Sequence, residues 1–326
     1  MGNMEESARR NNSYKVLSGS AHPELCDRIC AYLGVKRTDA LVTTFPDGET
    51  FVKINENIRG SDVFIVQPTC PPSNHNLMEL FIMVDAARRA SAERITAVMP
   101  FFGYARQDRK DQPRVPITAK LVANLLVAAG VDRVLTMDLH AGQIQGFFDI
   151  PVDHLYAMPV ILNHLNKEIL DPSEWVVVSP DVGNMKMTYA YSRALKMPMA
   201  IVAKNRVSAT KVEALELIGE VKGRNALIVD DLTETFGTVD TAANMIKQNG
   251  ARKIWAAISH AVLGSLGQKR LEESAVERVF STDSTPFATG AKVHSVTVAE
   301  LLGEGIQRIF NNQSVSSLFD IEKTRA

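Results

Sequence analysis

The sequence has few of the features that would place it in a membrane or an oxidising compartment. Its 326 residues include three cysteines, Cys26, Cys30 and Cys70, an odd number without the spacing of a metal site. Such a set indicates free thiols in a reducing compartment. No apolar run approaches the ~20 residues that a spanning helix needs, and the first residues lack the apolar core of a signal peptide. We therefore expect a cytoplasmic protein without a membrane partner.

The chain also lacks an excess of charge of either sign. It carries 36 basic and 37 acidic residues, with a net charge of −1. Because no global field attracts a polyanion, we expect no nucleic-acid partner, and any phosphate must be bound by a local group of residues. A length of 326 residues suits two domains, each with a core of its own.

Short apolar runs alternate with amphipathic segments along the chain, a pattern typical of α/β folds with parallel sheets. The layout begins again near Met158, so two similar domains are expected. Strands are predicted at 14–19, 40–45, 62–67, 94–99, 133–137, 175–179, 199–203, 226–229, 253–260, 276–281 and 294–298. Helices are predicted at 22–33, 76–89, 118–129, 160–170, 265–273 and 299–310, with one more ending at Gly250.

An apolar run, an acidic pair and a small hydroxyl-rich turn follow one another in NALIVDDLTETFGT. Asp230 and Asp231 are expected at the strand's C-terminal end, where they could accept hydrogen bonds from a sugar diol or hold a hydrated cation. Thr235, Gly237 and Thr238 lead into a helix whose first N–H groups attract an anion. An ordinary capped helix would explain any one of these features. Together they predict a site for a phosphorylated sugar.

A second candidate site is the most cationic loop of the chain. Arg106, Arg109, Lys110 and Arg114 lie within nine residues, and glycine and proline keep this stretch irregular. The alternative is a solvated charged loop. A cationic loop directly after a sheet strand is, however, well placed to close over a polyphosphate.

Three further strand ends carry candidate polar residues. Asp138 and His140 follow one strand and are expected to project from the same side of an extended segment. A structural, hydrogen-bonded histidine is the alternative there. Asp181 follows a second strand, and Lys204 and Arg206 follow a third, where snorkelling surface cations are the alternative.

These motifs resemble, in order and spacing, those of the class I ribose-phosphate pyrophosphokinases, also called PRPP synthetases. VDDLTETFGT is similar to the family's ribose-5-phosphate loop, YARQD to its ATP-binding segment, and DLHAGQIQGFFDIPVDHL to a family signature. The resemblance covers residues 14–319 and implies two tandem phosphoribosyltransferase-type, Rossmann-like domains, each a mostly parallel twisted sheet flanked by helices. The implied domains are 14–158 and 159–310, with 1–13 a disordered lead-in and 311–326 a tail that packs back on the N-terminal domain.

The resemblance also implies a role for each candidate residue. Those roles are catalysis for Lys204 and Arg206; ATP binding for Asp47, Glu49, Arg106, Gln107, Arg109 and Lys110; ribose 5-phosphate binding for Asp230, Asp231, Glu234, Thr235, Phe236, Gly237 and Thr238; and Mg²⁺ binding for Asp138, His140 and Asp181.

The implied reaction transfers the pyrophosphoryl group of Mg-ATP to the C1 hydroxyl of ribose 5-phosphate, giving PRPP and AMP. A hexameric homo-oligomer with ADP and phosphate control is implied as well. One alternative is a catalytically silent, PRPP-synthetase-associated subunit, which would carry an insertion in the cationic loop that this chain lacks. Another is a phosphoribosyltransferase that consumes PRPP, but it would leave the ATP loop and the second domain unexplained.

Four residues depart from the family pattern. Glu234 replaces an aspartate and Phe236 adds a ring beside the turn, so we expect a weaker grip on ribose 5-phosphate. Asn184 replaces a glycine, at a position where positive φ would be tolerated best by asparagine. Met187 stands where an arginine is usual, with Lys186 nearby to compensate in charge.

Overall fold

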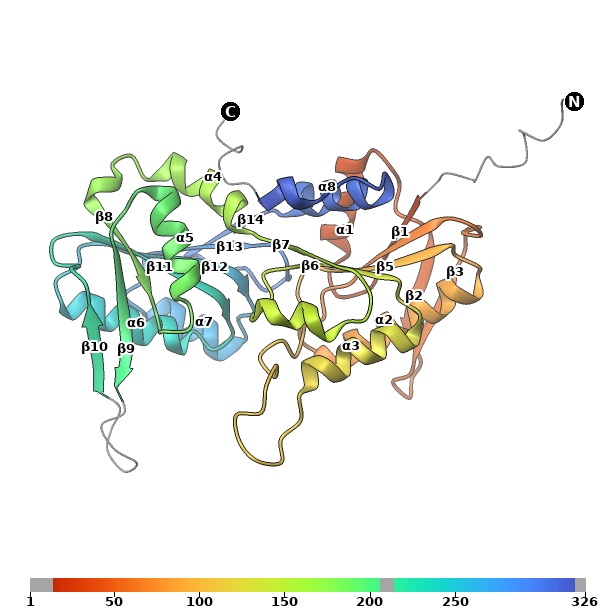
Figure 1. The fold of residues 1–326 in the computed structure, drawn as a ribbon, viewed down its shortest axis with the longest axis horizontal. Coiled ribbons are helices and arrows are strands. Elements are labelled where there is room, and N and C mark those ends of the chain that lie inside the picture. The colour runs from red at the N-terminus through yellow and green to blue at the C-terminus, as the bar shows by residue number, and fades with distance from the viewer. Residues whose placement is uncertain (1–13, 206–213, 320–326) are drawn as a thin grey trace, which may run out of the picture. The chain divides into compact units, whose positions relative to one another are not determined.

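The computed structural model describes residues 14–205 and 214–319. These residues form two compact units (Figure 1). Unit 1 runs as far as Leu155 and is completed by residues 299–319, and unit 2 runs from Tyr156 to Val298. No helix in the described ranges is both long and apolar enough to cross a membrane.

The sheet of unit 1 is entirely parallel. Its order is β1 (Tyr14–Ser18), β4 (Asp62–Val66), β5 (Arg94–Met99), β6 (Arg133–Met137) and β7 (Val152–Leu155). Because parallel strands end at one edge, the loops after β4, β5 and β6 share the carboxyl edge of this sheet. β7, which no prediction included, adds one more strand beside β6.

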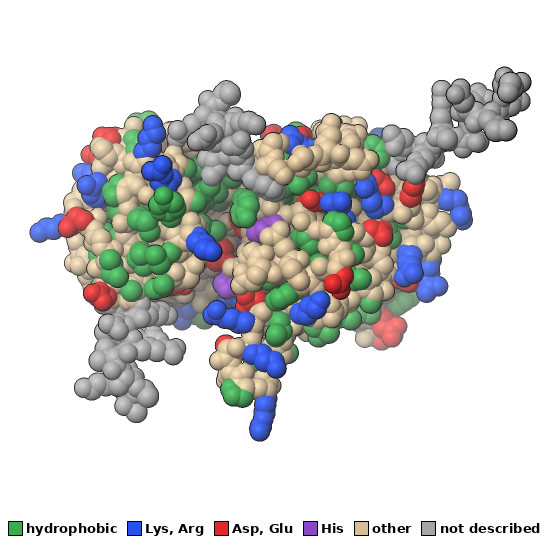
Figure 2. Space-filling view, in the orientation of Figure 1, with side chains coloured by type: hydrophobic (Ala, Val, Ile, Leu, Met, Phe, Trp, Pro, Cys, Tyr) green, Lys and Arg blue, Asp and Glu red, His purple; other side chains and the backbone are tan. Residues whose placement is uncertain are grey.

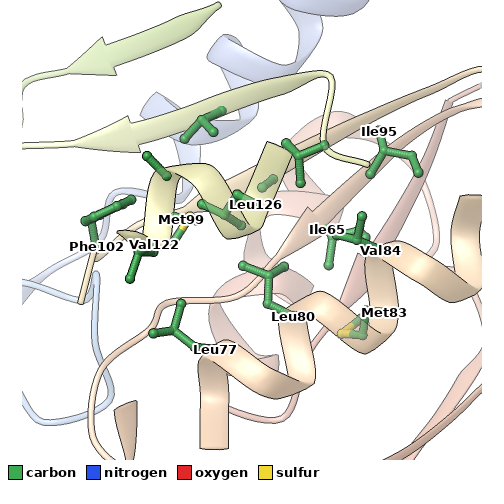
Figure 3. Packing of buried hydrophobic residues seen from close by; sticks show 14 of the residues in the cluster. Ile65, Leu77, Leu80, Met83, Val84, Ile95, Met99, Phe102, Val122 and Leu126 are labelled. Atoms are coloured by element: carbon green, nitrogen blue, oxygen red, sulfur yellow. The ribbon is translucent and has the colours of Figure 1, made fainter. Parts of the chain in front are cut away.

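Helices cover both faces of this sheet (Figure 1). α1 (Pro23–Leu33) and α8 (Ala299–Phe310) lie together on one face, and α2 (Ser73–Arg89) and α3 (Thr118–Ala129) on the other. Figure 3 shows the apolar side chains of α2 and α3, such as Leu80 and Leu126, packed with Ile65 and Met99 of the strands. The carboxyl edge is therefore built on a closely packed core.

The last helix belongs to unit 1, which corrects the expected boundary of the second domain at residue 310. A Cβ atom added to Gly303 would lie 2.5 Å from the ring of Tyr32, so glycine lets α8 approach α1 closely. Phe310 packs on Tyr14 of β1, with ring centroids 4.7 Å apart. The amphipathic pattern of α8 predicted a buried face correctly but does not say which core receives it.

Two further strands form a separate antiparallel ribbon, β2 (Ala40–Thr44) and β3 (Thr50–Ile54). Gly48, at φ 95°, makes the turn between them. Residues alternate along the ribbon, so that Val42 and Val52 pack against the core of unit 1 while Leu41 and Phe51 are exposed. The strand expected at 40–45 therefore exists but lies outside the parallel sheet.

Unit 2 contains a seven-stranded sheet. Its order is β10 (Ala214–Ile218), β9 (Met199–Asn205), β8 (Trp175–Ser179), β11 (Asn225–Thr233), β12 (Ile254–Ala261), β13 (Arg278–Thr282) and β14 (Val293–Val296). All neighbours pair in parallel except β10 with β9. α6 (Gly237–Gln248) and α7 (Ser265–Glu273) cover one face, and α4 (Met158–Glu168) and α5 (Met185–Leu195) the other (Figure 1).

Short 3-10 helices occupy Gly142–Phe147, Pro172–Glu174 and Ser316–Phe319. The three cysteines are free and buried, as predicted. Burial raises the pKa of the Cys70 thiol to about 12, so this thiol stays protonated.

Candidate functional site

The acidic pair of unit 2 lies inside a strand rather than beyond its end. β11 continues to Thr233, whereas the predicted strand stopped at residue 229. Its pairing with β8 ends at Ile228, but its pairing with β12 continues through Thr233. Asp230 and Asp231 therefore sit where β8 has ended and β12 still supports the backbone, which holds both acids firmly at the carboxyl edge.

Three carboxylates meet at this edge. Asp230 and Asp231 are buried, and burial is the main cause that raises the pKa of Asp230 well above its ordinary value, with the charges of Asp231 and Asp181 adding to it. Asp181 comes from the loop after β8 and is half-buried. A buried group of like charges favours a ligand that brings hydrogen-bond donors or a cation.

Asn184 links two of these carboxylates. Its backbone N–H donates to Asp181 Oδ1 at 3.1 Å, and its side-chain amide donates to Asp230 Oδ1. Its φ is −89°, so the position does not use the left-handed backbone that the replacement of a glycine suggested. The departure from the family pattern therefore adds a contact within the site.

The turn after β11 leads directly into α6. Glu234, Thr235 and Thr238 are exposed, and α6 begins at Gly237 without a side-chain cap among the described residues. The first N–H groups of such a helix have no partner within it and are open to an anion. The structure thus places the two threonines and Gly237 around an uncapped helix start.

Phe236 corrects our interpretation of the turn. We expected its ring to crowd the turn, but the side chain is 1% exposed and packs in the core of unit 2 with Val239 of α6. Its backbone is left-handed, at φ 59°. The ring therefore anchors the start of α6 in the core of unit 2.

One residue near this turn was missed by every sequence motif. Arg270 of α7 donates from Nη1 to the carbonyl oxygen of Thr235 at 3.2 Å. It is 35 residues away from Thr235 in sequence, and nothing in the pattern of α7 distinguishes it from other helical surface cations. Only the packing of α7 beside α6 brings it to the turn.

In unit 1, the cationic loop joins β5 to α3. Arg106, Gln107, Arg109 and Lys110 are all exposed, and Figure 2 shows Lys and Arg side chains along this projecting loop. Gln107 also fixes the start of α3, because its side chain accepts from Thr118 and its carbonyl oxygen accepts from the backbone N–H of residue 119. The loop therefore starts from a fixed base and presents its charges outward.

The segment after β6 differs from the prediction. Asp138 has a left-handed backbone, at φ 39°, and is buried, whereas His140 is exposed. The two side chains thus do not share one side of an extended segment. His154 of β7 holds the turn between them, since its Nε2 accepts from the backbone N–H of Leu139 at 2.9 Å.

Of the four remaining predicted residues, the structure describes the side chains of two, Asp47 and Glu49. Asp47 and Glu49 lie in the turn of the β2–β3 ribbon, where Asp47 Oδ1 accepts from the N–H of Glu49 at 3.1 Å. They are exposed and belong to a different sheet from the cationic loop. The side chain of Lys204, near the end of β9, and the whole of Arg206 lie outside the described residues.

The donors assigned to Mg²⁺ follow β6 and β8 at the carboxyl edges of the two sheets. Within the described part of the chain, no group of three His, Cys, Asp or Glu side chains is placed so that it could hold a metal ion. Mg²⁺ does not require one, since it keeps several waters and is usually held by one or two carboxylates and substrate phosphates. Asp181 and Asp230, whose charges interact, are oxygen donors of this kind. Asp181, one of the assigned donors, therefore fits a hydrated Mg²⁺ with Asp230 as a second oxygen donor.

Comparison with known proteins gives family matches in both units. Residues 14–130 match the N-terminal domain of ribose phosphate pyrophosphokinase, and residues 180–320 match the phosphoribosyl synthetase-associated domain. The chain is 52% identical over 309 residues to a ribose-phosphate pyrophosphokinase of Chlorobaculum tepidum, covering 94% of this chain and 95% of the relative. It is 50% identical over 310 residues to one of Rhodopirellula baltica, covering 94% and 98%.

A solved structure shares the fold. The crystal structure of phosphoribosylpyrophosphate synthetase from Mycobacterium smegmatis matches with a TM-score of 0.87 and 38% identity, over 92% of this chain and 99% of that chain. The fold is thus that of an α/β protein of two units, each built on a mostly parallel sheet flanked by helices. The chain belongs to the ribose-phosphate pyrophosphokinase family.

Proposed function

We propose that this protein transfers the pyrophosphoryl group of Mg-ATP to the C1 hydroxyl of ribose 5-phosphate, giving PRPP and AMP, in the cytoplasm. The observation that carries the proposal is the edge of unit 2, where a buried acidic pair lies one turn away from the uncapped start of α6. A sugar phosphate has a diol that the acidic pair can bind and an anionic phosphate that the start of α6 can bind.

The residues of unit 2 position the acceptor. Asp230 and Asp231 accept hydrogen bonds from the ribose hydroxyls, while Thr235, Thr238 and the N–H groups at the start of α6 bind the 5-phosphate. Holding both ends of the sugar fixes the direction of its C1 hydroxyl. Such positioning converts an encounter of two substrates into a step within one complex.

Residues of both units are assigned to the donor side of the reaction. Arg106, Gln107, Arg109 and Lys110 bind the triphosphate, and Asp47 and Glu49 are assigned to the nucleotide by resemblance. By resemblance, Mg²⁺ binding is assigned to Asp138 and His140 of unit 1 and to Asp181 of unit 2, and the bound ion would supply charge neutralisation on the phosphates. Lys204 and Arg206 oppose negative charge that develops on the transferred group, a kind of contribution worth about 10²–10³ in rate when one donor is removed.

The proposal also includes a homo-oligomer, a hexamer by resemblance, and control by ADP and phosphate. The competing proposal is a catalytically silent associated subunit. The cationic loop from Tyr104 to Thr118 keeps its length and its four cations, and this favours the enzyme.

The proposal predicts that the purified protein forms AMP from ATP only when ribose 5-phosphate and Mg²⁺ are both present. AMP and PRPP are measured by chromatography, with each component omitted in turn. Asp231→Asn should lower the rate by about 10²-fold, since it removes an acceptor of the buried pair. Asp171→Asn is the matched control, because Asp171 is exposed and only caps a short 3-10 helix of the same unit. A wild-type chain that binds ATP and ribose 5-phosphate without forming AMP would favour the silent subunit.

A further inference from the structure

Arg270 lies against the turn to which we assign the sugar phosphate. Its Nη1 is 3.2 Å from the carbonyl oxygen of Thr235. A Cβ atom added to Gly237 would lie 3.1 Å from the same nitrogen. The guanidinium therefore binds the turn at Thr235, and a side chain at position 237 would crowd it.

A second glycine brings α7 to this distance. A Cβ atom added to Gly267 would lie only 2.3 Å from the backbone oxygen of Glu234. Gly267 and Arg270 are three residues apart and thus share one face of α7. The face of α7 that approaches the turn closely is also the face that carries the arginine.

The hydrogen bond acts on the donors that an anion would use. The carbonyl oxygen of Thr235 and the N–H of Phe236 belong to one planar trans peptide, so they point in opposite directions. Holding the oxygen on the side of α7 directs this N–H to the other side. The N–H groups that follow belong to the first turn of α6, which has no side-chain cap among the described residues.

Arg270 also supplies charge where the turn has none of the right sign. Residues 233–238 include one ionisable side chain, that of Glu234, which is acidic. A guanidinium has five N–H donors in a rigid plane, and among the described residues Arg270 uses one of them, at Nη1, to bind the carbonyl oxygen of Thr235.

We propose that Arg270 is a positioning residue for sugar-phosphate binding: it holds the peptide that joins Thr235 to Phe236 so that the N–H groups of the turn and of α6 face the phosphate. This inference rests on the proposed function, because it assigns ribose 5-phosphate to this turn. Arg270 acts on affinity for the sugar phosphate and takes no part in the transfer step.

The test compares Arg270→Ala and Arg270→Lys with Lys269→Ala in the full-length protein. Lys269 is the adjacent, exposed cation on α7, so its removal changes the same charge on the same helix without touching the turn. Ribose 5-phosphate binding is measured by isothermal titration calorimetry, and KM and kcat for both substrates by AMP formation. Thermal unfolding of each variant shows whether it is folded.

We expect Arg270→Ala to weaken ribose 5-phosphate binding and raise its KM about tenfold or more, the scale of a hydrogen bond from a charged donor. KM for ATP and kcat at saturating sugar should stay within about twofold, and Arg270→Lys should recover part of the affinity. Lys269→Ala should bind like the wild type. A purely structural role would instead lower thermal stability and kcat together, with no rescue by lysine.

Two outcomes separate the two proposals. If folded Arg270→Ala binds ribose 5-phosphate as tightly as the wild type, the positioning role is overturned while the proposed reaction stands. If the wild type binds ribose 5-phosphate but forms no AMP, the reaction is overturned, and the calorimetric difference between the variants still decides the role of Arg270.

Discussion

Phe236 combines two opposing contributions to stability at the start of α6. Its ring is buried in the core of unit 2, while its backbone is left-handed at φ 59°, a conformation that costs a residue with a Cβ atom roughly 1–2 kcal/mol. Truncation of a core phenylalanine to alanine typically lowers the free energy of unfolding by about 3–5 kcal/mol. The burial term is therefore the larger, and it explains why a bulky residue occupies a turn position that suits glycine.

This balance predicts that Phe236→Ala lowers the free energy of unfolding by about 3–5 kcal/mol, and that Phe236→Gly lowers it by roughly 1 kcal/mol less, because glycine accepts the left-handed backbone. Urea unfolding followed by tryptophan fluorescence measures both. The only two tryptophans, Trp175 and Trp255, lie in unit 2 with ring centroids 4.6 Å apart, so the signal reports the unit that contains the substitution. Equal loss in the two variants would contradict the assigned backbone cost.

Asp230 links the stability of the unliganded protein to pH. Burial and the charges of Asp231 and Asp181 raise the pKa of Asp230 well above its value of 3.8 in an unfolded chain. At a pH between the unfolded and the folded pKa, Asp230 therefore holds a proton in the folded chain that it has released in the unfolded chain. The stability contributed by this group is complete below the unfolded pKa and is lost as pH rises through the folded pKa.

The prediction is that Asp230→Asn raises the melting temperature of the unliganded protein at about pH 8, and that the gain shrinks as pH falls toward the unfolded pKa. The same substitution should remove an acceptor for the sugar and lower kcat/KM for ribose 5-phosphate by about 10²-fold. Circular dichroism melts across the pH range test the first part. Asp171→Asn is again the control, because hydrogen bonds from Ser173 lower the pKa of Asp171 and its loss brings no gain at high pH. If the variant is no more stable than the wild type at high pH, ionising Asp230 in the folded protein does not lower the free energy of unfolding, and the prediction is wrong.

At the scale of elements, the buried parallel strands and most helices could be predicted from the sequence. β5 and β6 have the predicted bounds, because a strand covered on both faces is a continuous apolar run with polar flanks. β7 was missed since Asp153 and His154 interrupt its short run. No helix was predicted over α5, although its buried residues Thr188, Tyr191 and Leu195 recur at helical spacing. The β2–β3 ribbon shows that a correct strand can still be assigned to the wrong sheet.

The candidate site was predictable where its residues are neighbours in sequence and not where they come from different elements. The acidic pair and the start of α6 form one segment, so their order indicated the chemistry. The contacts of Asn184 with Asp230 and of Arg270 with Thr235 join residues 46 and 35 positions apart. Such contacts depend on which strands and helices lie side by side, and no local pattern encodes that.

At the scale of the whole molecule, the β2–β3 ribbon of unit 1 offers a surface for self-association. Its inner residues pack on the core, and its outer side exposes Leu41 by 48%, Phe45 by 48% and Phe51 by 37%, with the two aromatic rings 5.4 Å apart. Neighbouring exposed apolar side chains of this kind mark interaction surfaces, whereas single ones are ordinary. The net charge of −1 adds no general repulsion between copies.

We therefore expect size-exclusion chromatography with light scattering to give a mass that is a multiple of 35.8 kDa, six-fold for a hexamer. Replacing Leu41 and Phe51 by serine should shift the protein toward smaller species at equal concentration, because the apolar area that association buries is lost. Leu170→Ser is the matched control. Leu170 is an apolar side chain that is 91% exposed, but it lies in unit 2 and not on the ribbon. A wild-type mass of one chain would contradict the proposed assembly. An assembly unchanged by the double substitution would place its interface on another surface of the protein.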